Sequence, residues 1–129
     1  MARTPQEEAN VQLVLDLFNK VLIPMDSSRV DEFIAPEYVQ HSSLAEPTVA
    51  ALKAFLDHVR KVSPDATQTI HRVLVDGDLV AVHLHVVRWP GDPGLAVADF
   101  FRCENGMIVE HWDVIQDIPA EPVNANSMF

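Results

Sequence analysis

Hydrophobic residues follow two different periods along this chain, one typical of helices and one typical of strands. Up to Pro64, apolar side chains recur three or four positions apart, as on one face of a helix. From Thr67 to Gln116, apolar and polar side chains largely alternate, as on the two faces of a strand. This order predicts an α+β domain, with helices first and a mainly antiparallel sheet second.

The first half contains signals for three helices. Residues 4–7, Thr-Pro-Gln-Glu, form a helix start with a capping box, and Pro24 ends the apolar stripe that follows. A short second helix is predicted over residues 28–34, with Ser and Asp as a capping pair, and a third over residues 47–63. Between them, residues 37–42 are expected to form a brief strand.

The second half predicts two β-hairpins and a tail. The expected strands are residues 67–75 and 79–89 around Asp76-Gly77, then 95–103 and 107–116 around Glu104-Asn105-Gly106. Residues 119–129 contain two prolines and little periodicity, so we expect an extended tail that follows a domain over residues 1–118.

The register of the second hairpin decides which polar side chains share a face. If its turn has two residues, Asp99 falls opposite Trp112. If residues 104–106 form a three-residue loop, Asp99 falls opposite His111, on the same face as Asp113. Both loops suit this sequence, and we favour the second.

Composition narrows the classes of partner. The chain has 129 residues, of which 48% are hydrophobic, enough for one domain with a real core. Its net charge of -10 argues against nucleic acid and anionic membrane surfaces as partners. No apolar run approaches the roughly 20 residues of a membrane span, and the polar N-terminus does not resemble a signal peptide. With Cys103 as the single cysteine, we expect a cytoplasmic protein.

Five short stretches carry a resemblance to a known family. They are YVQH at residues 38–41, VAVH at 80–83, DFFR at 99–102, EHWDVIQ at 110–116 and NANSMF at 124–129. With the order of elements, they resemble the SnoaL-like proteins, relatives of polyketide cyclases in the nuclear-transport-factor-2-like superfamily. The resemblance implies a cone-shaped fold, with N-terminal helices packed on a curved, mainly antiparallel sheet that encloses a pocket. It also implies a reaction such as aldol-type cyclisation, isomerisation or dehydration.

A pocket with titratable side chains suits proton abstraction next to a carbonyl group, which needs a base and a donor for the enolate oxygen. The resemblance and the favoured register both point to Asp113 as the base. Asp99, His83 and His111 are its expected catalytic partners. The preceding hairpin would bring His85 opposite Asp99, into the same cavity.

The other candidates are expected to contact substrate rather than take a proton. They are Tyr38, Gln40, His41, Phe55, His85, Phe101 and Ile115. Their largely apolar surroundings predict a small apolar or cyclic carbonyl compound as the substrate, with no cofactor and no metal.

Two other functions also fit the sequence. The chain could be a non-catalytic module for small-molecule binding or dimerisation. A cupin-like metal site is suggested because Gly77 precedes His83 and His85 at the spacing of the first cupin motif. The carboxylate expected after His85 and the second cupin motif are missing from the sequence, which disfavours this site.

The opposite face of the second hairpin predicts a partner surface. Phe100, Trp112 and Val114 make it more apolar than a solvated sheet face. A homodimer through this face is therefore expected, and the resemblance implies the same. Arg102 and Glu110 on this face are expected to form a cross-strand ion pair.

Overall fold

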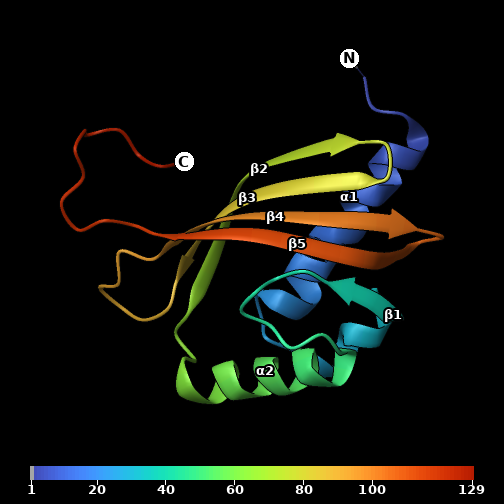
Figure 1. The fold of residues 1–129 in the computed structure, drawn as a ribbon, viewed down its shortest axis with the longest axis horizontal. Helices are drawn as coiled ribbons and strands as arrows, with labels where there is room; N and C mark the ends of the chain where they lie inside the picture. The colour runs from blue at the N-terminus through green and yellow to red at the C-terminus, as the bar shows by residue number, and fades with distance from the viewer. Residues whose placement is uncertain (1) are drawn as a thin grey trace.

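A curved five-stranded sheet forms the body of the molecule in the computed structural model, which describes residues 2–129 (Figure 1). In chain order, the elements are α1 (Pro5–Leu17), the π-helical turn η1 (Phe18–Leu22), the 3-10 helix η2 (Ser27–Glu32), β1 (Ile34–Gln40), α2 (Val49–Val62), β2 (Thr67–Asp76), β3 (Leu79–Val87), β4 (Leu95–Glu104) and β5 (Met107–Asp117). None of the helices within the described residues is long and apolar enough to cross a membrane.

The sheet has the strand order β1-β5-β4-β3-β2. The first strand pairs with β5 in parallel, and every other pair is antiparallel. Helix α1 packs on one face of the sheet, and α2 lies next to β1 (Figure 1). The predicted α+β cone fold is therefore confirmed.

The predicted start of the first helix is confirmed in detail. The Thr4 side chain accepts a hydrogen bond from the Glu7 backbone N–H, and the Glu7 carboxylate accepts one from the Thr4 N–H. Together these bonds satisfy two N–H groups that would otherwise lack partners at the helix start. Helix α2 begins in a similar way, because the Thr48 hydroxyl accepts from the Ala51 N–H at 3.1 Å.

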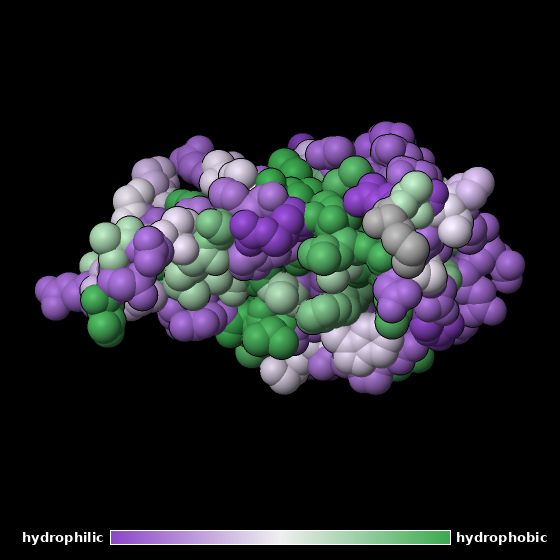
Figure 2. Space-filling model, turned by 90° about the horizontal axis from the view of Figure 1, so that it is seen from above, coloured by the Kyte–Doolittle hydropathy of each residue, from purple (hydrophilic) through white to green (hydrophobic). Residues whose placement is uncertain are grey.

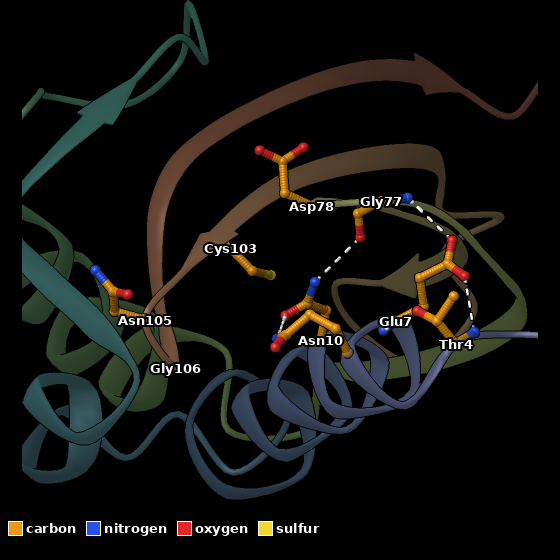
Figure 3. Close-up of a pocket in the computed structure, with 9 residues that line it drawn as sticks. Thr4, Glu7, Asn10, Gly77, Asp78, Cys103, Asn105 and Gly106 are labelled. Atoms are coloured by element: carbon orange, nitrogen blue, oxygen red, sulfur yellow. Dashed lines mark hydrogen bonds between the residues drawn. The ribbon is translucent and has the colours of Figure 1, made fainter.

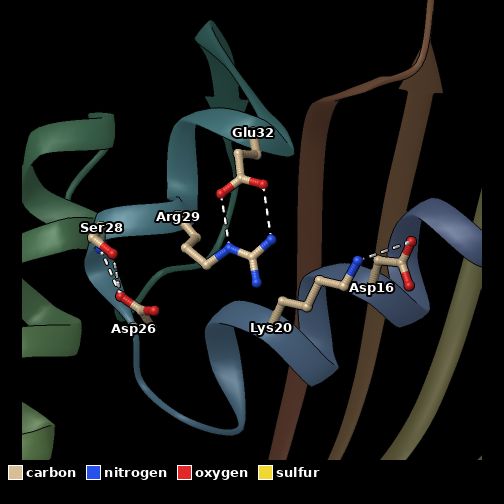
Figure 4. Close-up of polar contacts among 6 residues, drawn as sticks. All are labelled: Asp16, Lys20, Asp26, Ser28, Arg29 and Glu32. Carbon is tan, nitrogen blue, oxygen red and sulfur yellow. Dashed lines mark hydrogen bonds and ion pairs between the residues drawn. The ribbon is translucent and has the colours of Figure 1, made fainter.

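The segment between α1 and β1 differs from its sequence-based prediction. The second helix is the 3-10 helix η2, and its N-cap is Asp26, which accepts from the Ser28 N–H at 3.0 Å (Figure 4). Arg29 closes the turn with two hydrogen bonds to the Glu32 carboxylate, at 2.8 and 2.9 Å. The predicted cap at Ser28 is wrong because the acceptor lies two residues earlier. The strand predicted over residues 37–42 begins earlier, since β1 covers Ile34–Gln40.

Helix α1, η1 and one face of the sheet enclose the core. The fully buried side chains include Phe18 and Val21 from η1 and Val80, Val82 and Leu84 from β3. The spacing of two along β3 shows that alternate strand residues bury one face, as the sequence pattern predicts. We call this the inner face of the sheet, and the opposite face the outer face.

The register of β4 and β5 follows neither alternative considered from the sequence. Asn105 and Gly106 both have positive φ and form a two-residue turn that pairs Glu104 with Met107. A β-bulge then follows, so that Asp99 lies opposite Asp113. The favoured pairing of Asp99 with His111 is therefore wrong by two residues.

That error leaves Asp99, His111 and Asp113 on the face expected for them, because a shift of two residues does not exchange the faces of a strand. Asp99 and Phe101 share the inner face with His111 and Asp113. His111 lies opposite Phe101 and diagonal to Asp99, which is within reach for long side chains.

The register of β3 and β4 corrects a second prediction. His85 pairs with Ala96, and Asp99 pairs with Val82. The difference from the expected pairing of His85 with Asp99 is an odd number of residues, so His83 and His85 lie on the outer face. The predicted placement of these two histidines in the cavity is therefore wrong.

The connection between these strands explains the shift. Asp92 accepts hydrogen bonds from the backbone and side chain of Arg88, which hold the pKa of its carboxyl well below the ordinary range. Gly94 has φ +95°, and a Cβ there would lie 2.3 Å from the Val86 carbonyl oxygen. These contacts define the loop after which Val86 pairs with Leu95, so the expected pairing of His85 with Asp99 does not form.

The outer face carries exposed apolar side chains and the C-terminal tail. Leu74, Phe100 and Val114 are 60%, 39% and 65% exposed. Seen from above, hydrophobic side chains form a band across the middle of the molecule (Figure 2). The predicted ion pair is confirmed, because Arg102 Nε donates to Glu110 Oε1 at 2.8 Å.

The tail after β5 turns back over the outer face. Residues 118–129 contain no helix or strand. The Phe129 ring lies 4.5 to 5.1 Å from the rings of His71, His83 and His85. His83 and His85, which were expected in the cavity, thus contact the end of the chain on the outer face.

Candidate active site

A small cavity lies between the helices and the inner face of the sheet. Its volume is about 130 Å³. The residues that line it are Leu17, Leu22, Ile34, Tyr38, Gln40, Leu52, Asp99, Phe101, Ile108 and His111. They come from α1, η1, β1, α2, β4 and β5, so the cavity depends on the whole fold.

The polar side chains of this wall form one connected chain. His111 Nε2 lies 2.8 Å from Asp99 Oδ1, and His111 Nδ1 lies 2.7 Å from Gln40 Oε1. Gln40 Nε2 reaches the Tyr38 hydroxyl at 3.5 Å. Strand pairing explains the contact, because Gln40 lies opposite His111 in the parallel β1–β5 pair.

The bonds of Gln40 fix the tautomer of His111. Gln40 Oε1 also accepts from the Ser42 backbone N–H at 3.0 Å, so this atom is the amide oxygen. An oxygen accepts, so His111 Nδ1 carries a proton. A single proton then lies between Nε2 and Asp99, either on the carboxyl group or on an imidazolium.

Burial acts strongly on Asp99. The residue is 8% exposed. Burial raises the pKa of the Asp99 carboxyl above its ordinary value, the hydrogen bond with His111 opposes this effect, and the nearby Asp113 charge adds to it. A carboxylate with a raised pKa is a stronger base than an ordinary aspartate.

Tyr38 provides a hydroxyl group to the same cavity. The residue is 6% exposed, and burial raises the pKa of its hydroxyl, which therefore stays protonated. Within residues 2–129, the hydroxyl receives one hydrogen bond, from Gln40, and donates none. Its O–H hydrogen is thus free to bind an oxygen atom in the cavity.

Asp113 lies beside this pair but outside the cavity lining. It stands opposite Asp99 in the sheet and is half-buried. Asp99, His111 and Asp113 each offer an atom that could ligate a metal, and these atoms lie within 4.8 Å of one another. Both ring nitrogens of His111 are already bonded, so a metal ion on His111 would replace its bond to Gln40 or its bond to Asp99.

Comparisons with known proteins identify the family. Residues 14–111 match the family model of the SnoaL-like domain. The chain belongs to this family. The predicted resemblance is confirmed, and family membership supports a cyclase- or isomerase-type role on a small molecule. No functionally curated protein matches the chain.

Several solved structures have the same fold as this SnoaL-like protein. A proposed SnoaL-like polyketide cyclase from Jannaschia sp. CCS1 is 19% identical, with a TM-score of 0.75 and coverage of 95% of this chain and 99% of that one. AclR, a proposed hydroxylase from Streptomyces galilaeus, is 22% identical, with a TM-score of 0.71 and coverage of 85% and 90%. IdmH from Streptomyces antibioticus, a proposed polyketide cyclase, is 21% identical, with a TM-score of 0.67 and coverage of 82% and 91%. These likenesses show the fold alone.

The expected substrate contacts of this SnoaL-like protein lie in four different places, and the outer face, with His41 and His85, is one of them. Tyr38, Gln40 and Phe101 line the cavity. Ile115 lies on the inner face and packs against the core, outside the lining. Phe55 is 58% exposed on α2 and does not line the cavity.

His41 lies on the outer face, away from the cavity. Its Nε2 contacts Glu110 Oε2 at 2.6 Å, and its ring stacks on Trp112 at 4.9 Å. The predicted position of His41 at the cavity mouth is therefore wrong. Alternation along β1 gives the reason, because Tyr38 and Gln40 share one face and His41 follows on the other.

Sequence reasoning missed several apolar residues of the cavity wall. These are Leu17, Leu22, Ile34, Leu52 and Ile108. Leu22 and Leu52 do lie on the helical apolar stripes, but a stripe marks a core face and not which part of that face borders a cavity.

A larger groove lies at the other end of α1, and it is a weaker candidate. Its volume is about 790 Å³, and its wall includes Glu7, Asn10, Gly77 and Cys103 (Figure 3). Glu7 accepts from the Gly77 N–H, and Asn10 donates to the Gly77 carbonyl oxygen, so these groups already hold α1 to the β2–β3 turn. Burial raises the pKa of the Cys103 thiol to about 11, which keeps it unreactive.

Proposed function

We propose that this SnoaL-like protein is a cofactor-independent proton-transfer enzyme, which acts next to the carbonyl group of a small apolar molecule. Cyclisation of the aldol type, isomerisation and dehydration all begin with this proton transfer. The observation that carries the proposal is the buried pair of Asp99 and His111 in the wall of an apolar cavity. Such a pair offers a base in a place from which water is largely excluded.

Asp99 takes the role of the base. Its Oδ1 is bonded to His111, and its other oxygen, Oδ2, is free of hydrogen bonds within the described part of the chain. Oδ2 accepts the proton from the carbon next to the carbonyl group, and the bond between Asp99 and His111 keeps the carboxyl group oriented. In an isomerisation or dehydration, the same oxygen returns the proton to another atom of the substrate.

The Tyr38 hydroxyl stabilises the enolate oxygen that forms in this step. Its O–H hydrogen lacks a partner in the described residues, and it belongs to the same connected wall as Asp99. A donor that is already oriented toward the developing charge lowers the barrier without reorganisation.

Asp113, the base expected from the sequence, takes a secondary role in this proposal. It lies outside the lining, and its charge helps to raise the pKa of Asp99. A base must reach the proton that it abstracts, which favours Asp99.

The test is proton exchange of small ketones in D2O, followed by NMR with and without protein. Asp99→Asn should lower the exchange rate at least about 100-fold, as loss of a general base does. Asp113→Asn should have a much smaller effect. Asp117→Asn is the matched control, because its side chain is 83% exposed at the end of β5. Full exchange by Asp99→Asn would contradict the proposal, and loss confined to Asp113→Asn would return the role of base to Asp113.

A metal-dependent reaction is the second candidate, because Asp99, His111 and Asp113 place three possible ligand atoms within 4.8 Å. Metal analysis of the purified protein separates the two. A stoichiometric transition metal that is lost in His111→Ala would favour this candidate. The remaining candidate, a non-catalytic binding module, would be favoured by ligand binding without exchange.

The proposed assembly is a homodimer through the outer face. Phe100 and Val114 expose apolar surface in the centre of this face, and Leu74 extends it to β2. Val114→Glu should convert a dimer into a monomer in sedimentation experiments, because it would bury a charge in the interface. Val123→Glu, in the fully exposed part of the tail, is the control. A monomeric wild type, or a dimer that survives Val114→Glu, would contradict this assembly.

A further inference from the structure

The size of the cavity limits what it can hold. Its volume is about 130 Å³. Pockets for drug-sized ligands usually measure about 300 to 1,000 Å³. An engineered apolar cavity of about 150 Å³ binds benzene. A single ring or a short branched chain therefore fits this cavity, and a fused ring system does not.

Its lining is apolar apart from one wall. Six of the lining side chains carry no polar atom: Leu17, Leu22, Ile34, Leu52, Phe101 and Ile108. The other four are Tyr38, Gln40, Asp99 and His111, which are joined by hydrogen bonds and so lie together. A ligand that fits must therefore be apolar over most of its surface and polar at one point.

The bonds within the polar wall define that point. His111 uses both ring nitrogens on Gln40 and Asp99, and Gln40 uses its oxygen on Ser42 and His111. Three groups remain available to a ligand: the Tyr38 O–H, Asp99 Oδ2 and the second N–H of Gln40 Nε2, whose first N–H bonds the Tyr38 hydroxyl. The first donates, and the second accepts when ionised or donates when protonated. The Tyr38 and Asp99 side chains both line the cavity, so a ligand there meets a donor and a carboxyl oxygen in the same polar wall.

We infer that the substrate is a ketone or aldehyde of about the size of benzene, with a single ring or a short chain, whose oxygen binds the Tyr38 hydroxyl. A fused polycyclic compound is larger than this cavity, whose lining includes Leu22 and Leu52. The inference takes the carbonyl group from the proposed function. The limit on size and the role of Tyr38 stand on the cavity alone.

The experiment measures binding and not turnover. Cyclohex-2-enone, 1-tetralone and anthrone form a series of one, two and three rings with one carbonyl oxygen each, and benzene is the probe without oxygen. Each is titrated into the 15N-labelled protein, and shifts of the Gln40 and Ile108 amides are followed. We expect cyclohex-2-enone to bind at least about 10-fold more tightly than anthrone, because overpacking of a core is unfavourable.

Two variants test the walls and the hydroxyl separately. Leu52→Ala should admit 1-tetralone, because it removes a side chain from the lining, whereas Leu44→Ala, at a residue that is 77% exposed, should not. Tyr38→Phe should weaken cyclohex-2-enone about 5- to 10-fold and leave benzene unchanged, as expected for one hydrogen bond.

The outcomes separate this inference from the proposed function. Binding of anthrone to the wild type as tightly as cyclohex-2-enone would overturn the size limit. Equal weakening of benzene and cyclohex-2-enone by Tyr38→Phe would overturn the role of the hydroxyl. Tight, size-selective binding of cyclohex-2-enone without proton exchange would support the inference and contradict the proposed function.

Discussion

The sheet carries a histidine–carboxylate pair on each of its two faces, and the two pairs behave in opposite ways. On the inner face, His111 and Asp99 are 2.8 Å apart, and both side chains are largely buried. On the outer face, His41 and Glu110 are 2.6 Å apart, and the His41 side chain is 41% exposed. Distance and residue type are thus similar, and the surroundings differ.

The surroundings shift the pKa values of the two carboxyl groups in opposite directions. Burial raises the pKa of Asp99. Arg102 and then His41 lower the pKa of Glu110, which stays ionised. Arg102, a third partner with a permanent charge, makes Glu110 part of a structural ion pair, whereas burial in the wall of an apolar cavity favours the protonated form of Asp99.

Removal of each histidine should give the largest difference between the faces. His111→Ala leaves the buried Asp99 without its partner and should lower the free energy of unfolding by about 3 kcal/mol at pH 7. His41→Ala leaves Glu110 bonded to Arg102, so its effect should be a small fraction of that value. Urea denaturation of both variants measures the difference. Equal losses would mean that burial does not distinguish the pairs.

Much of the inner face could be predicted from the sequence, because the period of two assigns residues to faces without an exact register. The pattern correctly predicts one shared face for Asp99, His111 and Asp113, although the expected partner of Asp99 is wrong by two residues. The β-bulge near Arg102 leaves no clear signal in the sequence, since bulges depend on how the sheet curves. The exact register of β4 and β5 therefore could not be predicted from the sequence.

The outer-face errors have different causes. His41 could have been placed correctly, because it directly follows Gln40, the last residue of β1, and successive side chains of an extended chain point to opposite faces. His83 and His85 could not, because their face depends on a loop whose length is set by the bonds of Asp92 and by Gly94. Side chains alternate between the two faces along a strand. An odd-numbered error in loop length therefore moves every side chain of the next strand to the other face.

The pH dependence of stability should differ in sign between the two carboxylates. The pKa of Asp99 is raised in the folded state, so the stability that it contributes is complete below the unfolded value of about 3.9 and is lost as pH rises through the folded value. Asp99→Asn removes this loss and should gain stability relative to the wild type as pH rises above the unfolded value.

The pKa of Glu110 is lowered, so its contribution is present above the unfolded value of about 4.3 and is lost as pH falls through the folded value. Glu110→Gln should therefore be less stable than the wild type near neutral pH, and the deficit should shrink in acid. Urea denaturation of the two variants at several pH values provides the measurement. Parallel curves for both variants would remove the distinction between the faces.

The smallest expected effect concerns Phe129 on the outer face. Burial lowers the pKa of His83, and the charges of Arg72 and His71 lower it further. The Phe129 ring, 5.1 Å from the His83 ring, contributes to this burial. Phe129→Ala should therefore raise the pKa of His83 and lower the free energy of unfolding by about 1 kcal/mol or less.

Titration of the histidine ring protons by NMR measures the first effect, and Val123→Ala in the same tail is the control, because Val123 is fully exposed. The cavity should bind its ligands unchanged in Phe129→Ala, since no residue of the described tail lines it. An unchanged His83 titration would show that the tail does not cover the outer face in solution. Weaker ligand binding would show instead that the two faces are coupled, and the comparison between an outer structural face and an inner reactive face would then fail.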